Sequence, residues 1–314
     1  MRILITGGFG YIGGRLAQFL IAKNDNEVLL GSRQLVSIPA WLPEAQVIQI
    51  EWEKSNELEN ICSGVDVVVH LAGMNMQDCA ADNVAAIEFN ALATARLLQA
   101  AVRKGVKRFV YQSTAHVYGS PLDGVITETT CPLSLHPYAT SHRAGEDVVR
   151  AAQQLGEIEG IVIRLSNAFG CPTHKEVNCW MLLVNDLCRQ AVLSQHMVLR
   201  SSGIQRRDFI TMLDVCRAIN HLLYLPTKSI GNGLINVGGE WSPTLWEIAC
   251  LIQERCEVVL GFKPKLTRVK PQINETASKL EYRIDTLRLT GYEPSANRIE
   301  EIDQLLKFCK ASAP

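Results

Sequence analysis

A glycine-rich loop directly after the first apolar run is the feature that most constrains the fold of this chain. Residues 2–5 have the apolar pattern of a strand, and Thr6-Gly7-Gly8-Phe9-Gly10-Tyr11-Ile12-Gly13 leads from them into an amphipathic stretch over residues 12–22. Glycine permits a tight turn and close backbone approach to a ligand, and a helix N-terminus offers unpaired N–H groups to an anion. A strand, a glycine turn and a helix in this order predict a dinucleotide pyrophosphate site, formed by Gly7, Gly10, Tyr11, Ile12 and Gly13.

Short apolar runs alternate with helix-like stretches through the first half of the chain. We predict strands at 3–5, 28–30, 47–50, 65–71, 109–112 and 161–165, and helices at 12–22, 84–104 and 136–155. Nearly continuous apolar strands that alternate with helices are typical of a parallel sheet covered on both faces. The second half is less regular, with helices predicted at 178–190, 213–225 and 244–254.

These patterns predict the fold class and the domain organisation. We expect an α/β protein with a Rossmann-type, doubly wound parallel sheet. The dinucleotide-binding domain would span residues 1–170, with return segments near 205–240. A smaller, mostly helical and discontinuous C-terminal lobe would span residues 171–314, pack tightly on the sheet and bind the substrate.

Charge and cysteine usage exclude several classes of partner. The formal net charge is −1, so we expect no nucleic-acid partner. No apolar run approaches the length that spans a bilayer, so we expect no membrane partner. The ten cysteines are scattered without a Cys-x-x-Cys pair. This spacing favours free thiols, a cytoplasmic location and no metal site.

A second motif, Tyr138-Ala139-Thr140-Ser141-His142, carries the chemistry. Together with the glycine loop it resembles the signature of the extended short-chain dehydrogenase/reductases, of the sugar-nucleotide epimerase/dehydratase type, which read Tyr-x-x-x-Lys. The segment Ser113-Thr114-Ala115-His116-Val117-Tyr118-Gly119 resembles a second motif of these enzymes. The resemblance implies that Thr114 binds the reacting oxygen and that Tyr138 moves its proton. His142 would replace the lysine that lowers the tyrosine pKa and holds the nicotinamide ribose.

The replacement of lysine by histidine at position 142 leaves three interpretations open. Position 142 lies one helical turn after Tyr138, on the same face. A full charge about 6 Å away, at an effective dielectric constant of ~20, would be worth roughly 3 kcal/mol, or about two pKa units. A histidine of ordinary pKa is mostly neutral at neutral pH. Either His142 is a working substitute with a shifted pH optimum, or the chemistry barely needs a strong tyrosine base, or the chain only binds its ligands.

The end of the second predicted strand decides between NAD and NADP. Ser32 falls where NAD-type members of the family carry an aspartate, and Arg33 follows it. Arginine pairs with a 2′-phosphate, whereas a carboxylate would repel it. We therefore expect NADP, with NAD as the alternative. The resemblance also places Glu51, Trp52, Leu71, Ala72, Gly73 and Asn90 at the cofactor.

Two later segments resemble the substrate-binding motifs of the same enzymes. Asn167 ends Arg164-Leu165-Ser166-Asn167, and Arg207 lies in Gln205-Arg206-Arg207-Asp208-Phe209-Ile210. The resemblance implies that both contact the diphosphate of a nucleotide sugar, and the loop 74–79 places Asn75 beside the pocket. His116 stands where relatives carry a carbon acid or base, although a histidine that only shapes the pocket is the competing interpretation.

The resemblance implies an NAD(P)-dependent enzyme that transfers a hydride at a ring carbon of a nucleotide-diphosphate sugar. We rank an epimerase first. The alternatives are a sugar-nucleotide 4-ketoreductase, an atypical dehydratase that uses His116, a reductase of another carbonyl compound, and a non-catalytic dinucleotide-binding sensor or scaffold. The resemblance also implies a homodimer through the helices that begin near Val84 and His136.

Overall fold

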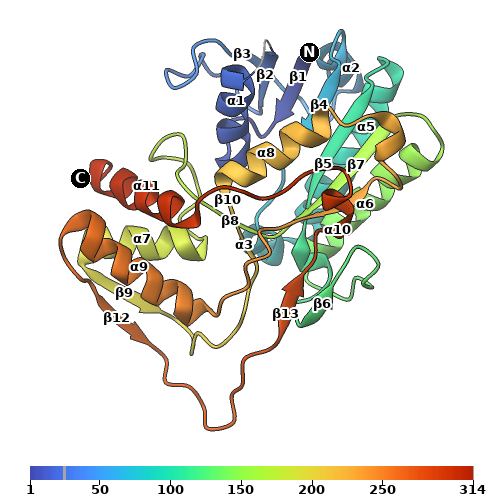
Figure 1. Ribbon diagram of the computed structural model, residues 1–314. Helices are drawn as coiled ribbons and strands as arrows, with labels where there is room; N and C mark the ends of the chain where they lie inside the picture. The colour runs from blue at the N-terminus through green and yellow to red at the C-terminus, as the bar shows by residue number, and fades with distance from the viewer. Residues whose placement is uncertain (24–25, 314) are drawn as a thin grey trace.

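The computed structural model describes residues 1–23 and 26–313, and its centre is a seven-stranded sheet (Figure 1). The strand order is β11-β7-β5-β4-β1-β2-β3, and each neighbouring pair is parallel. The strands are β1 (Arg2–Thr6), β2 (Glu27–Ser32), β3 (Gln46–Gln49), β4 (Val67–His70), β5 (Arg108–Thr114), β7 (Glu159–Leu165) and β11 (Leu234–Val237). The strand order reverses between β1 and β4, so their carboxyl ends flank the crevice where such folds bind ligands.

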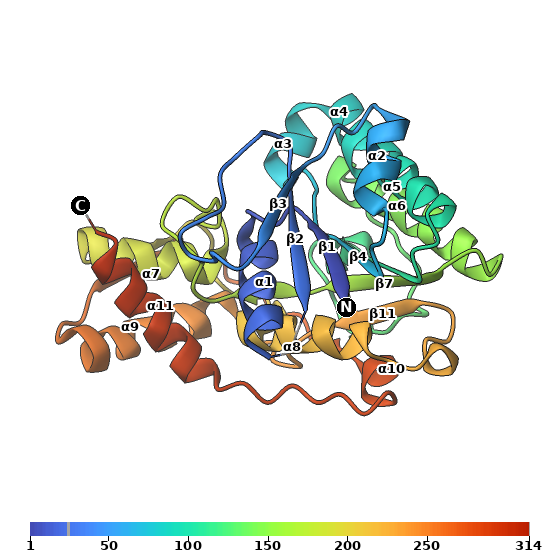
Figure 2. The same ribbon diagram turned by 90° about the horizontal axis from the view of Figure 1, so that it is seen from above.

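Helices cover both faces of this sheet, as the sequence predicts (Figure 2). The helices α1 (Tyr11–Lys23) and α8 (Met212–Leu223) pack together on one face. The other face carries α2 (Ser55–Cys62), α5 (Ala93–Arg103) and α6 (Pro137–Gln154). Alternate residues of β1 face the two layers: Ile3 and Ile5 join one core cluster, and Leu4 joins the other. The predicted doubly wound α/β fold is confirmed.

The helix predicted over residues 84–104 is interrupted. The structure contains α4 (Asn83–Ile87), a π-helical turn η1 (Glu88–Leu92) and then α5. A short helix α3 (Met76–Ala81) precedes them. A π-helical turn accommodates one extra residue and frequently occurs at functional sites. Here it carries Asn90, one of the predicted cofactor-site residues.

The C-terminal part has a hydrophobic core of its own, formed by three helices and a two-stranded sheet (Figure 1). These elements are α7 (Leu183–Ser194), α9 (Leu245–Leu260), α11 (Arg298–Ala311), β9 (His196–Leu199) and β12 (Lys265–Arg268). Helix α7 begins at Leu183 and not near residue 178, because residues 177–182 form consecutive backbone turns. Helix α9 runs past the predicted end at 254 to Leu260, where Gly261 ends it at a φ of 80°.

Two short parallel pairs connect this part to the sheet domain (Figure 1). They are β6 (Gly124–Ile126) with β13 (Leu280–Tyr282), and β8 (Asn167–Phe169) with β10 (Phe209–Thr211). The remaining elements are η2 (Ala115–Val117), η3 (Thr227–Ser229) and α10 (Asp285–Arg288). In the described part of the chain, no helix is both long enough and apolar enough to cross a membrane.

Candidate active site

The glycine loop forms a cradle of closely packed backbone at the start of α1. Gly7 has a φ of 69°, and its carbonyl accepts a hydrogen bond from Gly10 N at 2.8 Å. A Cβ added to Gly13 would lie 2.2 Å from this carbonyl oxygen, and one added to Gly7 would lie 2.9 Å from Ala72 N. Larger residues therefore do not fit, and the backbone can approach a ligand closely. This geometry fits a dinucleotide pyrophosphate at the N-terminus of α1.

Tyr11 and Ile12 open the helix, but their side chains face the protein. The Tyr11 hydroxyl donates to the Gly170 carbonyl at 2.8 Å, and Ile12 packs against the core. For these two residues, only the backbone N–H groups are suited to the pyrophosphate. At the predicted pyrophosphate site, Tyr11 and Ile12 would therefore contribute their backbone and not their side chains.

The end of β2 presents a free arginine beside an aromatic ring. Ser32 is half-buried, and its hydroxyl accepts a hydrogen bond from Gln34 N at 3.2 Å. Arg33 is exposed, with its guanidinium 5.7 Å from the ring centroid of Phe89. No ion pair of Arg33 with a carboxylate occurs in the described residues. The arginine is thus available to an anionic ligand at this edge of the sheet.

Glu51 and Trp52 follow β3 on the same side. Glu51 forms an ion pair with Lys54, and its side chain is partly exposed. The Trp52 ring lies 5.7 Å from the ring of His70 and 5.5 Å from that of Phe89, and its buried Nε1 has no hydrogen-bond partner. Trp52 therefore packs against His70 at the end of β4 and against Phe89 of η1.

The loop after β4 lies against the cradle and against α6. Leu71 N donates to the Thr6 carbonyl at 3.2 Å, and Ala72 N donates to Thr6 Oγ1 at 3.3 Å. Gly73 is exposed, and a Cβ added there would lie 3.3 Å from Asn90 Oδ1 and 3.5 Å from Cε1 of His142. The predicted cofactor loop is thereby placed next to the predicted catalytic helix.

Asn90 is a structural residue at this point. Its side chain is 1% exposed, accepts a hydrogen bond from Met74 N at 2.7 Å and donates to Ser141 Oγ at 3.0 Å. The predicted direct contact with the cofactor is therefore unfavourable, because the amide is already engaged by the protein. Asn90 instead fixes the loop after Gly73 to α6.

Thr114, Tyr138 and His142 meet where β5 ends against α6. Thr114 Oγ1 accepts from His116 N at 3.1 Å and so caps η2. The rings of Tyr138 and His142 are 4.6 Å apart and nearly perpendicular. The ring of His116 lies 6.3 Å from that of Tyr138. The three residues predicted around Tyr138 are therefore brought together.

Burial controls the protonation of these groups. It raises the pKa of Tyr138 above its ordinary value, and the nearby Thr114 hydroxyl partly offsets this rise. It lowers the pKa of His142 to about 4, so that His142 is neutral at pH 7. No cation of the described chain replaces the lysine of the Tyr-x-x-x-Lys motif at position 142, because the buried histidine there does not hold a proton.

Arg207 lies close enough to His116 to affect its protonation. Burial lowers the pKa of His116 to about 4, and the positive charge of Arg207 contributes to this. The Nδ1 atom of His116 is buried without a hydrogen-bond partner. Arg207 contacts Gln205 at 3.4 Å and forms no ion pair with a carboxylate of the described residues, and burial lowers its pKa. A half-buried, unpaired guanidinium of this kind suits an anionic ligand.

Two other predicted substrate residues have structural partners. Asn75 caps α3, where its side-chain oxygen accepts from Gln77 N and Asp78 N. The Asn167 side chain donates to the Asp208 carbonyl at 2.9 Å. The predicted substrate contact of Asn75 is disfavoured for the same reason as that of Asn90, since its amide already serves as a helix cap.

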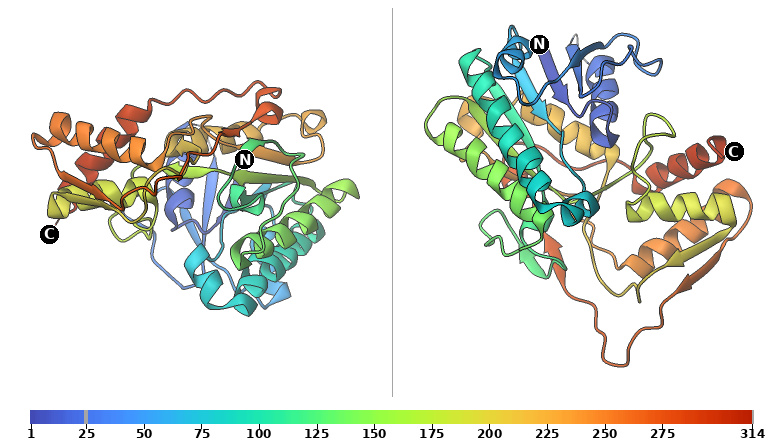
Figure 3. Two further views of the ribbon diagram at one scale, coloured as in Figure 1. Left: turned by 90° about the horizontal axis from the view of Figure 1, so that it is seen from below. Right: turned by 180° about the vertical axis from the view of Figure 1, so that it is seen from behind.

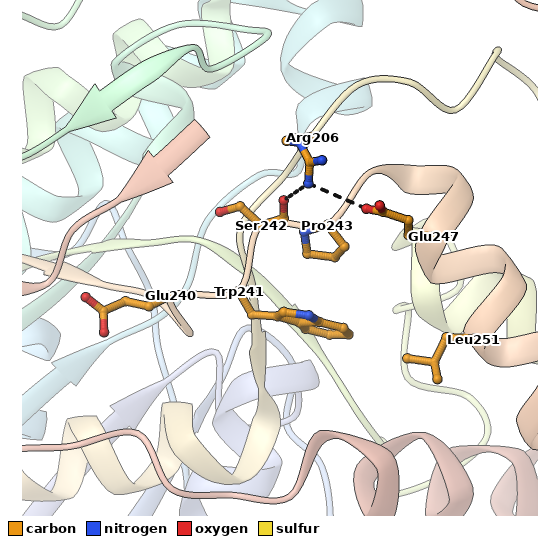
Figure 4. Close-up of a pocket in the computed structure, with 7 residues that line it drawn as sticks. All are labelled: Arg206, Glu240, Trp241, Ser242, Pro243, Glu247 and Leu251. Carbon is orange, nitrogen blue, oxygen red and sulfur yellow. Dashed lines mark hydrogen bonds and ion pairs between the residues drawn. The ribbon is translucent and has the colours of Figure 1, made fainter. Parts of the chain in front are cut away.

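A separate hollow lies elsewhere in the structure. It has a volume of about 450 Å³ and is lined by Arg206, Glu240, Trp241, Ser242, Pro243, Glu247 and Leu251 (Figure 4). Arg206 is paired there with Glu247 and with the Ser242 carbonyl. None of the predicted site residues lines it. The neighbouring residues Arg206 and Arg207 thus lie in two different environments.

The α/β fold agrees with what comparison with known proteins shows. Residues 3–238 match the model of the NAD dependent epimerase/dehydratase family. The chain belongs to this family.

Proteins similar to this chain include sugar-nucleotide epimerases and dehydratases. An uncharacterized UDP-glucose epimerase of Bacillus subtilis is 26% identical over 273 residues, which are 81% of this chain and 82% of the relative. A putative UDP-glucose 4-epimerase of Methanocaldococcus jannaschii is 24% identical over 98% of both chains. Among solved structures, the UDP-glucose 4-epimerase of Thermotoga maritima with UDP-glucose superposes with a TM-score of 0.81, 20% identity and 99% coverage of both chains. At this identity, the superposition shows the shared fold.

Several residues of this epimerase/dehydratase family member were not apparent from the sequence. Tyr111 lies 2.9 Å from Nδ1 of His142, and Glu146 forms a buried ion pair with Arg164. Glu146 also accepts a hydrogen bond from Ser113 on β5, so α6 is fastened to β5 and β7. The position of Glu146 could have indicated its buried role, because it follows His142 by four residues and thus lies on the same face of the helix.

Proposed function

We propose that this protein is an NADP-dependent epimerase that acts on a nucleotide-diphosphate sugar. The observation that supports this most directly is the meeting of Tyr138 with Thr114, next to the unpaired Arg207. A tyrosine that can move a proton at an oxygen, beside a cation that can bind a diphosphate, suits reversible oxidation of a sugar carbon. Membership of the epimerase/dehydratase family supports the same activity.

The cofactor would occupy the crevice at the carboxyl ends of β1, β2 and β4. Gly7, Gly10 and Gly13 would hold its pyrophosphate, because their backbone leaves no room for a Cβ. Ser32 and Arg33 would hold the 2′-phosphate of NADP, since Arg33 is exposed and carries no competing carboxylate. A solved relative, the UDP-glucuronic acid 4-epimerase of Bacillus cereus, is described in complex with NAD, so NAD is the alternative.

The protein side of the mechanism uses three residues. When bound, the nicotinamide supplies the acceptor and donor of a hydride at the sugar carbon. Tyr138 removes the proton of the sugar hydroxyl during oxidation and returns it on reduction, while Thr114 holds the same oxygen. His142, being neutral, serves as a hydrogen-bond donor and not as a charge. The centre is inverted when the ketone is reduced on its opposite face.

His116 supports a second candidate, an atypical dehydratase. Its unpaired Nδ1 is buried beside Tyr138, and the low pKa of the imidazole leaves it neutral and able to accept a proton. A base in this position could remove a proton from the carbon next to a transient ketone. A product that has lost water would favour this candidate over the epimerase.

We also propose a homodimer and a cytoplasmic location. The helical segments α4 and η1, which contact α6, expose three apolar side chains: Val84, Ile87 and Leu92. Helix α6 itself runs beside α5 (Figure 3). Light scattering of the wild type and of Val84→Asp tests the dimer, which would be contradicted by a monomeric wild type. The ten free cysteines support a reducing compartment, and localisation of the tagged protein in its own cell tests this.

A panel assay tests the proposed activity. The purified protein is incubated with NADP or NAD and with UDP- and dTDP-activated hexoses, and the products are identified by NMR. We expect one hexose to be converted into its epimer and Tyr138→Phe to lose the conversion while it still binds cofactor. Binding of cofactor without conversion of any sugar nucleotide would favour the sensor or scaffold interpretation.

A further inference from the structure

A buried hydrogen bond joins Tyr111 of β5 to His142 of α6. The Tyr111 hydroxyl lies 2.9 Å from Nδ1 of His142. The side chain of Tyr111 is 1% exposed and that of His142 is also buried. Because Tyr111 is this deeply buried, its hydroxyl acts on the imidazole and not on a ligand.

The direction of this hydrogen bond follows from the neighbouring acceptors. The carbonyl oxygens of Asn90 and His142 lie farther from the Tyr111 hydroxyl, at 3.3 and 3.4 Å. The Asn90 carbonyl also receives the Thr94 hydroxyl at 2.8 Å. Nδ1 is therefore the nearest of these acceptors to the Tyr111 hydroxyl, which also interacts with the Thr94 hydroxyl. A neutral imidazole that accepts at Nδ1 carries its own proton on Nε2.

A second histidine beside this pair has the same arrangement. Thr6 Oγ1 lies 2.6 Å from Nδ1 of His70, and Nε2 of His70 lies 2.9 Å from Thr94 Oγ1. Since Thr94 donates its proton to Asn90, it accepts one from Nε2 of His70, and Thr6 donates to Nδ1. The ring of His70 stacks on that of Tyr111 at 5.7 Å. Hydroxyl groups on β1 and β5 thus lie within hydrogen-bond distance of Nδ1 in both histidines.

A helical glycine makes room for the Tyr111 hydroxyl. A Cβ added to Gly145 would lie 2.6 Å from this oxygen. Gly145 lies three residues after His142, on the buried face of α6. The close approach of α6 to β5 at this point therefore serves the contact between Tyr111 and His142.

The other nitrogen of His142 lies beside Gly73, in the loop after β4 where the cofactor is proposed to bind. A Cβ added to the exposed Gly73 would lie 3.7 Å from Nε2. The nearest carboxylate on α6 is Glu146, which is already paired with Arg164 and Ser113. His70 and His116, the two nearby imidazoles, are neutral because burial lowers their pKa to about 3 and about 4. No charge among these neighbours therefore competes with Tyr111 for the imidazole.

We propose that Tyr111 is a positioning residue that holds His142 in the tautomer with its proton on Nε2, the nitrogen beside Gly73. His142 then presents a hydrogen-bond donor where the Tyr-x-x-x-Lys motif presents an ammonium. The acceptor is a ribose hydroxyl of the nicotinamide cofactor, and this last step rests on the proposed function. The donor is fixed before the cofactor binds, because Tyr111, Thr94 and Asn90 are parts of the protein core.

Nitrogen NMR tests this without any turnover. The full-length protein is labelled with ¹⁵N-histidine, and the signals of His142 are assigned by their loss in His142→Gln. At pH 7, without cofactor, we expect an unprotonated Nδ1 and a protonated Nε2. In Tyr111→Phe the two tautomers should mix, and NADP⁺ should bind about three- to tenfold more weakly, as for the loss of one hydrogen bond. Tyr292→Phe, which loses a buried hydroxyl contact to the Asp214 carbonyl, is the matched control and should change neither quantity.

The possible outcomes separate this inference from the proposed function. A protonated Nδ1 in the wild type would overturn the role of Tyr111, whether or not Tyr111→Phe folds and whatever reaction the protein catalyses. An unchanged tautomer and unchanged NADP⁺ affinity in a folded Tyr111→Phe would also overturn it. The predicted tautomer without conversion of any sugar nucleotide would support the role of Tyr111 and reject the proposed function instead.

Discussion

The ring of His142 lies edge-on to the ring of Tyr138, with centroids 4.6 Å apart and an interplanar angle of 75°. Burial pushes their pKa values in opposite directions, upward for Tyr138 and downward to about 4 for His142. Both groups are therefore uncharged at neutral pH in the free protein. Proton transfer by Tyr138 thus depends on hydrogen bonds and not on a fixed neighbouring cation.

Replacing His142 by lysine would introduce that cation. A charge about 5 Å from the tyrosine, at an effective dielectric constant of ~20, is worth about 3 kcal/mol, or about two pKa units. Since ionised Tyr138 is the base, the rate of sugar oxidation by the wild type should rise with pH. In His142→Lys the rising limb should move to lower pH by up to about two units. The measurement is the pH profile of kcat, and a limb that does not move would mean that the charge at position 142 does not act on Tyr138.

Arg207→Ala should weaken substrate binding, whereas Arg206→Ala should not. Arg207 is a half-buried cation without an ion pair, and a hydrogen bond from a charged group contributes about 1.5–3 kcal/mol. We expect the Kd of the sugar nucleotide to rise roughly ten- to a hundredfold in Arg207→Ala. Arg206 is paired with Glu247 in the separate hollow, and such exposed pairs contribute little. Equal affinities of the two variants in calorimetry would argue against a diphosphate clamp.

Arg33→Ala should reduce the preference for NADP. The lost guanidinium is exposed and unpaired, so the change should leave the fold intact. We expect the Kd of NADP to rise about tenfold or more, with little change for NAD. Ser32→Asp should shift the preference further toward NAD, because a carboxylate repels the 2′-phosphate and accepts from a 2′-hydroxyl. Binding constants for both cofactors decide this, and a wild type that prefers NAD would show the NADP assignment to be wrong.

Acid should destabilise the folded protein through its buried histidines. Burial lowers the pKa of His142 to about 4, from an ordinary value of 6.5. Between these values the unfolded chain binds a proton that the folded chain does not, so the free energy of unfolding falls as the pH falls. His70 and His116 act in the same direction, while Asp208, whose pKa burial raises to about 7, acts in the opposite one.

Urea unfolding at several pH values measures this effect. His142→Gln removes one of the contributing groups. The loss of unfolding free energy between pH 6.5 and pH 4 should be smaller in this variant, by about 1.4 kcal/mol per pH unit. Parallel curves for the wild type and His142→Gln would show that His142 takes up a proton in the folded state as readily as in the unfolded chain.

Local patterns in the sequence predicted the parts of the structure that local forces determine. The glycine cradle follows from Gly7, Gly10 and Gly13, whose spacing is sufficient to specify the turn. The main strands and helices follow from apolar periodicity. The π-helical turn at Glu88–Leu92 could not be predicted, since it depends on Asn90 reaching both Met74 and Ser141.

At the candidate active site, too, only the residues that lie in short local motifs could be predicted from the sequence. Thr114, Tyr138 and His142 were found because they lie in short motifs, and the structure brings them together. Tyr111 was missed because its partner His142 is 31 residues away and its strand has the pattern of an ordinary buried strand. Asn75 and Asn90 were assigned to ligands, but the structure uses their amides as a helix cap and a loop anchor. A side-chain amide can bind a ligand or hold the backbone equally well, so only the folded structure shows which of the two roles Asn75 and Asn90 have.

The most direct test of the central claim uses a nucleotide hexose that carries deuterium on the carbon that is inverted. The hexose is one that the panel assay converts, and the reaction is followed by NMR in ordinary water. If oxidation and reduction occur at this carbon, the epimer should keep its deuterium, and Tyr138→Phe should form no epimer. Loss of the deuterium to water during conversion would contradict hydride transfer at this carbon and would point instead to a proton-transfer mechanism.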